Sequence, residues 1–221
     1  MRADIVRRIT RAYDDPIVRA YCWVRFWILR QRFLDEIGQY LPPSGPVLDI
    51  GCGFGLFSLY YAATAPGRFV RGIDLNARRV AMARRAASRL SIENVAYEQG
   101  DARTFKGDGE VVAAYMLDIV HHVAVDAVPP LLRRLHASLA PGGVLIVKDV
   151  DTHPAPKRWF TWTLDKLMAP STPVRYWSGD ELTGALRGAG FEVRRHAMLD
   201  FLPYPHVLYI GAKRGYRHEA R

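Results

Sequence analysis

The chain has 221 residues, of which 49% are hydrophobic and 24% are charged, so it is long enough for one domain with a sizeable core and its composition excludes disordered and collagen-like proteins. With only two cysteines, the chain cannot form a framework of several disulfides. It also lacks a run of about 20 apolar residues, the length that a membrane-spanning helix needs. The net charge of +9 fits a nucleic-acid or anionic-membrane partner, or an arginine-rich solvated surface, which we favour. Without a recognisable signal peptide, we expect a cytoplasmic protein, with a peripheral position at a membrane surface as an alternative.

The predicted elements alternate along most of the chain. Residues 1–41 are helical in character and rich in aromatic side chains. From residue 46 onward, short apolar runs alternate with helical segments, which is the pattern of a parallel sheet covered by helices. Seven strands are predicted, at residues 46–50, 69–75, 95–99, 110–117, 144–150, 191–198 and 207–212. Helices are predicted between them at residues 55–65, 77–89, 128–139 and 182–187. Asn76 is the expected cap of the second of these helices, Ser178 and Glu181 have the spacing of a capping box before the fourth, and residues 141–143 are expected to turn into the fifth strand.

The most informative segment runs from Val47 to Gly55, where a predicted strand enters a glycine-rich turn and a helix follows. Glycine tolerates a sharp bend and lets a ligand lie directly against the backbone. The helix N-terminus beyond the turn presents unpaired N–H groups. The spacing from Asp49 is D-x-G-x-G-x-G, whereas the third glycine of the dinucleotide fingerprint would fall at Leu56. The turn therefore predicts a ligand site that is not built for a pyrophosphate.

The segment from Asp49 to Gly55 resembles motif I of the class I S-adenosylmethionine-dependent methyltransferases. Later segments are similar to that family and follow in its order: Gly72-Ile73-Asp74-Leu75, Gly100-Asp101-Ala102 and Leu139-Ala140-Pro141-Gly142-Gly143. The resemblance points to the small-molecule or lipid-type subgroup. It implies an α/β fold of the three-layer, Rossmann-like methyltransferase type. That fold has a mostly parallel seven-stranded sheet with helices on both faces, an N-terminal helical cap and an insert after the fifth strand.

We therefore expect a single methyltransferase domain over residues 1–221. Its parts are a helical cap (1–41), a cofactor-binding half (42–151), a lid insert (152–177) and the C-terminal half of the sheet (178–221). The cap and the insert together hold all five tryptophans. Large aromatic side chains are costly to leave in water, which indicates that these two segments form an apolar cover.

The resemblance implies that the chain binds S-adenosyl-L-methionine and releases S-adenosyl-L-homocysteine (SAH). Asp74 would hold the ribose hydroxyls, Asp101 would accept from the adenine amino group, and Asp49 would lie near the methionine end. Asp74 and Asp101 have the alternative of a surface turn or helix cap, and Asp49 has the alternative of orienting the loop. The expected cofactor-binding residues are Asp49, Gly51, Cys52, Gly53, Gly55, Asp74, Leu75, Asp101, Ala102 and Leu117.

A catalytic candidate follows the fourth predicted strand. Ile119-Val120-His121 resembles the segment whose histidine is the general base in many small-molecule O-methyltransferases. The departure is His122, which stands where that family usually has an acid, so a structural role for His121 is an equal alternative. His122, Asp118 and Trp159 are candidate substrate contacts. Asp149, near the end of the fifth predicted strand, has the alternatives of contact with an amine acceptor and of hydrogen bonds to nearby backbone groups, and we favour the second. We expect no metal site, because adjacent histidine side chains diverge and the spacing suggests no third ligand.

These residues predict methyl transfer to an oxygen or nitrogen of a small, hydrophobic or lipid-like acceptor by in-line displacement. The first alternative is a methyltransferase for RNA or another nucleic acid. It lacks support because no D/N-P-P-Y/F loop follows the fourth strand, and neither Cys22 nor Cys52 is placed for chemistry at C5 of a base. A non-catalytic cofactor-binding module is the second alternative. The acceptor, the oligomeric state and a peripheral membrane contact stay open.

Overall fold

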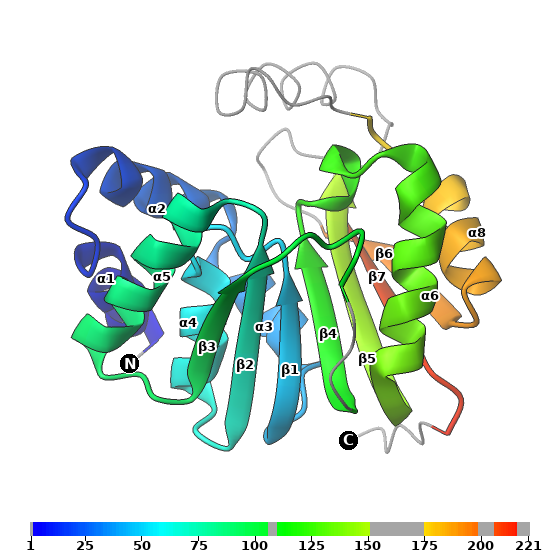
Figure 1. Cartoon of the computed structure of the whole chain (residues 1–221), viewed down its shortest axis with the longest axis horizontal. Coiled ribbons are helices and arrows are strands. Elements are labelled where there is room, and N and C mark those ends of the chain that lie inside the picture. The colour runs from blue at the N-terminus through cyan, green and yellow to red at the C-terminus, as the bar shows by residue number, and fades with distance from the viewer. Residues whose placement is uncertain (1, 106–109, 151–174, 199–205, 216–221) are drawn as a thin grey trace. The chain divides into compact units, whose positions relative to one another are not determined.

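The computed structural model describes residues 2–105, 110–150, 175–198 and 206–215 (Figure 1). Its strands form a seven-stranded sheet in the order β3-β2-β1-β4-β5-β7-β6, which confirms the expected fold class. The sheet is mixed, because β7 runs antiparallel to both β5 and β6. The chain forms two compact units, one from α1 to β3 with the start of β4, and one from the rest of β4 to β7.

The first unit is a parallel three-stranded arrangement with helices packed against it. The strand β1 (Gly45–Ile50) pairs with β2 (Arg68–Asp74), and β2 pairs with β3 (Val95–Gln99). The helices α4 and α5 pack against β2 and β3, and α1 packs against both helices. The helices of this unit are α1 (Arg2–Arg11), α2 (Pro16–Ile28), α3 (Gln31–Gly38), α4 (Leu56–Thr64) and α5 (Ala77–Leu90).

Short polar side chains fix where two of these helices begin. Asp15 caps α2 by accepting from the backbone N–H groups of Ile17 and Val18. Asn76 caps α5 by accepting from the N–H of Arg79, as the sequence predicted. Such caps satisfy donors that the helix itself leaves unpaired. The Asn76 cap sets the start of α5 directly after β2, which ends at Asp74.

The second unit contains an antiparallel arrangement in which β7 (His206–Ala212) lies between β5 (Leu139–Val150) and β6 (Glu192–Ala197). The strand β4 (Val111–Leu117) leads into two short 3₁₀ turns, Val120–His122 and Val125–Ala127. The helices α6 (Val128–Ser138) and α8 (Gly179–Gly188) pack against each other. Ser178 and Glu181 form the predicted capping box of α8.

Most boundaries differ from the prediction by one to three residues, and the largest difference lies at the start of β5. The helix expected over residues 128–139 ends at Ser138, and Leu139 already belongs to β5. The expected turn at residues 141–143 lies within this longer strand, where Gly142 has a φ of 81° and the carbonyl of Gly143 accepts from the N–H of Lys213. Hydrogen bonding to a distant segment extends the strand through residues whose local preference is for a turn.

Candidate functional site

The turn between β1 and α4 has a left-handed backbone at each of its glycines. The φ angles are 77° at Gly51, 55° at Gly53 and 80° at Gly55, a region that other residues adopt only with strain. The N–H groups of Gly51 and Cys52 donate to the carbonyl of Ile73 at 2.8 and 3.1 Å, which fastens the turn to β2. These backbone contacts hold the start of the turn against the end of β2.

Asp74 links this turn to the next helix. One carboxylate oxygen accepts from the N–H of Gly53 at 2.9 Å, and the other accepts from the N–H of Asn76 at 2.8 Å. The side chain is buried at the end of β2. A carboxylate has about four acceptor positions, so two backbone bonds leave it able to accept from ligand hydroxyls. The geometry places Asp74 beside the glycine turn, as the sequence prediction requires.

Asp49 lies at the other end of the turn, inside β1. It is 3% exposed, and its carboxylate accepts from the hydroxyl of Ser58 in the first part of α4. A buried carboxylate is costly unless it is hydrogen-bonded, and the Ser58 hydroxyl supplies a donor. Asp49 therefore ties β1 to α4 and helps to set the direction in which the helix leaves the turn.

Two buried tyrosines also hold the turn, and sequence reasoning missed both. The hydroxyl of Tyr13 donates to the carbonyl of Phe54 at 2.7 Å, and the hydroxyl of Tyr97 donates to the carbonyl of Gly55 at 3.1 Å. Burial raises the pKa of Tyr13 and of Tyr97 well above the ordinary value, so both stay protonated donors. The only sequence signal was an aromatic residue in the cap and another in the third strand.

The turn is closed on one side and open on the other. A Cβ atom added at Gly55 would lie 2.5 Å from the hydroxyl oxygen of Tyr97, whereas one added at Gly53 would meet nothing within 4 Å. An open backbone position beside a carboxylate with spare acceptor capacity is what a bound nucleoside with ribose hydroxyls requires. The residues of this turn and Asp74 therefore fit the S-adenosyl group that the sequence resemblance implies.

Both cysteines are buried, which has a consequence for their reactivity. Burial raises the pKa of Cys22 to about 12 and raises that of Cys52 further, with the nearby Asp49 and Asp74 adding to the rise at Cys52. Only the thiolate is nucleophilic. We therefore expect both thiols of the folded protein to resist iodoacetamide at pH 8 and to react once urea unfolds it, as measured by mass spectrometry. Rapid alkylation of either cysteine in folded protein would contradict its burial.

The remaining predicted cofactor residues of this unit lie at strand ends but are less enclosed. Asp101 follows β3, and its carboxylate forms an ion pair with the guanidinium of Arg103 at 2.6 Å. Leu75 follows β2 and is 64% exposed, while Ala102 is half-buried. The N–H of Gly100 donates to the carbonyl of Asp74 at 3.0 Å, which ties the ends of the two strands together. A role for Asp101 in adenine binding remains a prediction.

In the second unit, His121 is paired with a buried carboxylate. The Nδ1 atom of His121 lies 2.5 Å from Oδ1 of Asp149, and the backbone N–H of His121 donates to Oδ2 at 3.1 Å. Asp149 also accepts from the N–H of Val150 at 2.7 Å, and both side chains of the pair are buried. A carboxylate at Nδ1 favours the tautomer with its proton on that atom, so Nε2 becomes the basic nitrogen. Sequence reasoning considered Asp149 but did not pair it with His121.

Asp118, a predicted substrate residue, is also engaged by a neighbour in β5. Its carboxylate forms an ion pair with the amino group of Lys148, whose side chain is fully buried. Its backbone N–H donates to the carbonyl of Lys148 at 2.9 Å, and its φ of 57° is unusual for a residue other than glycine. Such strain occurs where the surrounding contacts impose it. Leu117, a predicted cofactor residue, is buried at the end of β4.

The chain returns to His121 at the end of the predicted insert, where the described structure resumes. The N–H of Arg175 donates to the carbonyl of His121 at 2.9 Å, and the ring centroids of Tyr176 and His121 are 5.6 Å apart. The ring of His122, another predicted substrate contact, lies 4.1 Å from that of His121 by the same measure, so these adjacent side chains do not diverge as the sequence analysis expected. The far end of the predicted lid insert is therefore attached beside the candidate base. Trp159 lies outside the described residues.

Within the described ranges, no group of three or more His, Cys, Asp or Glu side chains could hold a metal ion. No helix in that same part of the chain combines the length and apolar character needed to cross a bilayer.

Solved structures of methyltransferases share this fold. An O-methyltransferase family protein from Burkholderia thailandensis has a TM-score of 0.70 at 18% identity, covering 90% of this chain and 61% of that one. Magnesium protoporphyrin IX methyltransferase from Synechocystis, solved with bound SAH, has a TM-score of 0.68 at 19% identity, covering 94% of this chain and 93% of the other. At such identities the likeness shows the fold alone.

Sequence relatives match over shorter stretches. Trans-aconitate 2-methyltransferase from Deinococcus radiodurans is 33% identical over 113 residues, which are 50% of this chain and 40% of that enzyme. Release factor glutamine methyltransferase from Vibrio cholerae is 40% identical over 66 residues, 30% of this chain and 23% of the relative. The matched regions thus span less than half of either relative.

The family model for the methyltransferase domain matches residues 25–196, most of the chain. The chain therefore belongs to the methyltransferase-domain family, within the class I S-adenosylmethionine-dependent methyltransferases.

Proposed function

We propose that this protein transfers the methyl group of S-adenosylmethionine to an oxygen or nitrogen of a small, hydrophobic or lipid-like acceptor. The observation that supports binding of S-adenosylmethionine is the glycine turn. It has an open position at Gly53, and the N–H of Gly53 donates to Asp74. S-adenosylmethionine supplies a methyl group on a positively charged sulfur, which keeps the electron pair of the broken bond and leaves as SAH. The chain supplies the fixed turn and the acceptors that orient the nucleoside.

The proposed role of His121 is to receive the proton that the acceptor loses as its oxygen or nitrogen bonds to the methyl carbon. Asp149 acts as a positioning residue, because it binds Nδ1 and the backbone N–H of His121 and so directs Nε2 as the basic atom. It also offsets the positive charge that the imidazole gains. A hydroxyl or amine acceptor that does not readily lose its proton in water would react faster when such a base accepts that proton.

The acceptor class is supported by the relatives and by the aromatic residues of this chain. Trans-aconitate and magnesium protoporphyrin IX, the molecules named for two similar methyltransferases, are small organic molecules, whereas the release factor named for a third relative is a protein. Tyr176 and the buried Trp177 lie at the end of the predicted insert, and the ring of Tyr176 is beside that of His121. Pockets for organic ligands are mostly apolar with a few placed polar groups. A small hydrophobic acceptor therefore fits better than a polynucleotide.

Two measurements test this function separately. Isothermal titration calorimetry with SAH tests the cofactor site, and we expect binding tighter than about 1 mM, with adenosine alone binding more weakly. Transfer of labelled methyl from S-adenosylmethionine to a panel of phenols, amines, quinones, phospholipids and RNA tests the acceptor. Folded protein that takes up no SAH would overturn the proposal. Label found in RNA but in no small molecule would leave the cofactor site standing and overturn the acceptor class.

A further inference from the structure

The helix α2 exposes large apolar side chains along its outer face. Ile17 is 79% exposed, Trp23 is 62% exposed and Trp27 is 47% exposed. Trp23 and Trp27 are four residues apart, so they lie one above the other on one face of the helix. The inner face is apolar as well, and there Val18, Cys22 and Phe26 are buried. The helix is thus apolar on both sides, while only one side is covered by the first unit.

The charge pattern of this helix is one-sided. The sequence from Pro16 to Ile28 contains arginines but no acidic residue. Arg19 is exposed and lies one helical turn before Trp23, on the same outer face. An exposed strip that combines tryptophan with arginine and lacks carboxylates is typical of a helix that lies in the interface of an anionic bilayer.

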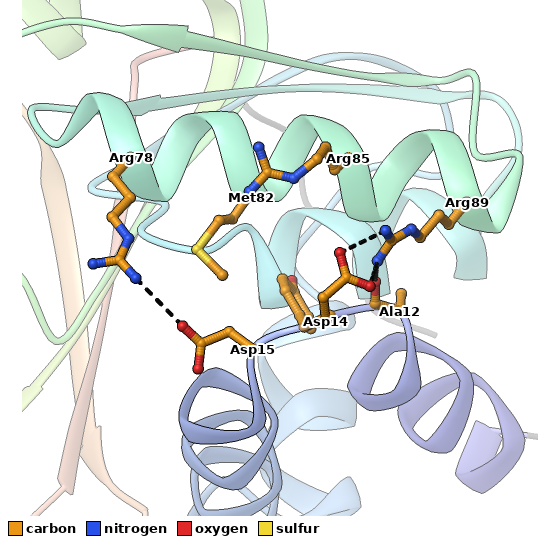
Figure 2. A pocket seen from close by; sticks show the side chains of 8 residues that line it. Ala12, Asp14, Asp15, Arg78, Met82, Arg85 and Arg89 are labelled. Atoms are coloured by element: carbon orange, nitrogen blue, oxygen red, sulfur yellow. Dashed lines mark hydrogen bonds and ion pairs between the residues drawn. The ribbon is translucent and has the colours of Figure 1, made fainter.

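More arginines gather where α2 begins. A shallow pocket there is lined by side chains of the loop before α2 and of α5, and Figure 2 shows them facing one another. Arg89 forms an ion pair with Asp14 at 2.5 Å, and Arg78 forms one with Asp15 at 3.3 Å. The pKa of Asp14 is lowered, chiefly by its hydrogen bond to Arg89, and the charges of Arg85 and Arg19 act in the same direction. This cluster therefore holds three arginines, Arg78, Arg85 and Arg89, against two aspartates, an excess of positive charge to which the nearby Arg19 adds.

We propose that the outer face of α2, with the arginine cluster at its start, is a docking surface for an anionic lipid bilayer. The tryptophans would enter the region between headgroups and acyl chains, and the arginines would meet lipid phosphates. The helix has 13 residues, too short to cross a bilayer but long enough to lie along its surface. A second copy of the chain fits less well, because a two-fold contact through this face would bring the same arginines together.

This surface would bring the protein to the membrane from which a lipid-like acceptor comes, and only that link rests on the proposed function. Binding itself is tested by flotation of the full chain with vesicles of phosphatidylcholine alone or mixed with phosphatidylglycerol. We expect flotation with the anionic vesicles, little with the neutral ones, and a blue shift of tryptophan fluorescence. Raising the salt concentration should weaken binding, because salt screens the arginine–phosphate attraction.

Variants connect the binding to α2. The double variant Trp23→Ser/Trp27→Ser should lower vesicle affinity by at least about tenfold, and Arg19→Glu by about fivefold or more. Phe69→Ser is the matched control, because Phe69 is an exposed aromatic residue (45%) outside α2, and it should float as the wild type does. All variants should keep wild-type affinity for SAH, which shows that the first unit is folded and keeps a failed cofactor site distinct from a failed docking surface.

Three results would overturn the docking surface. The first is wild-type protein that does not float with anionic vesicles. The second is flotation that Trp23→Ser/Trp27→Ser leaves unchanged. The third is a concentration-dependent dimer in analytical ultracentrifugation that the double variant abolishes, without any vesicle binding, which would assign the face to a second copy of the chain.

Discussion

Gly53→Ala is expected to remove most of the affinity for SAH while leaving the protein folded. The added methyl group would meet no protein atom within 4 Å, so the open space at this position is available to a ligand. The φ of 55° at Gly53 costs an alanine about 1 kcal/mol, which a folded domain tolerates. If the nucleoside lies against this backbone, the methyl group occupies its place. We expect the dissociation constant to rise by at least about tenfold, a free-energy loss of about 1.4 kcal/mol.

Gly55→Ala is the matched variant two residues away, and it should affect folding as well. Here the φ is 80°, and the new Cβ would lie 2.5 Å from the hydroxyl of Tyr97. Because that hydroxyl also donates to the carbonyl of Gly55, it cannot move away without losing its acceptor. We expect a loss of about 2–4 kcal/mol in the free energy of unfolding, from backbone strain and overpacking together.

Urea unfolding and calorimetry with SAH on both variants separate the two effects. The prediction requires that Gly53→Ala keep most of its unfolding free energy while SAH affinity falls, and that Gly55→Ala lose both. Wild-type SAH affinity in Gly53→Ala would show that no ligand lies against this position. A large loss of stability in Gly53→Ala would show that the open space at Gly53 is filled in the folded protein.

The sequence predicted the local part of this site well. Strand periodicity and glycine spacing are local signals, and they placed β3 at its observed residues and placed the turn between β1 and α4. Asp74 was predictable for a similar reason, since a strand end that follows the glycine helix must return to the neighbourhood of the turn in a parallel arrangement. The residues that hold the turn were harder to find. Tyr13 reaches the carbonyl of Phe54 across 41 positions of the chain, and no periodicity encodes such a contact.

In the second unit, too, contacts between residues far apart in the sequence could not be predicted. Sequence reasoning named His121 and Asp149 separately, but the pairing of residues 28 positions apart depends on the 3₁₀ turn after β4 and on the position of β5. The burial of Lys148 could not be predicted from the sequence, because a lysine in a strand ordinarily lies on the solvent face. Its burial is possible because Asp118 supplies a paired carboxylate, and an unpaired buried ammonium would be very costly.

The pairing of His121 with Asp149 predicts a large loss of turnover when His121 is replaced. His121→Ala should lower turnover by at least about tenfold, and by as much as the roughly 10²–10⁴-fold that a general base contributes, while SAH affinity stays within about twofold. The variant should also lose the pH dependence of turnover that a general base confers on an enzyme. His136→Gln is the control, since His136 belongs to the same unit but packs against Phe191 instead.

Asp149→Asn distinguishes a base from a structural histidine. The amide keeps the shape but removes the negative charge that favours the proton on Nδ1 and offsets the charged imidazole, so turnover should fall toward that of His121→Ala. Three hydrogen bonds converge on this carboxylate, so we also expect a loss of about 1–3 kcal/mol in unfolding free energy. If both variants lost stability but kept the wild-type turnover and pH profile, His121 would be a structural residue. The proton would then leave the acceptor by another route, and the cofactor site in the glycine turn would be unaffected by that result.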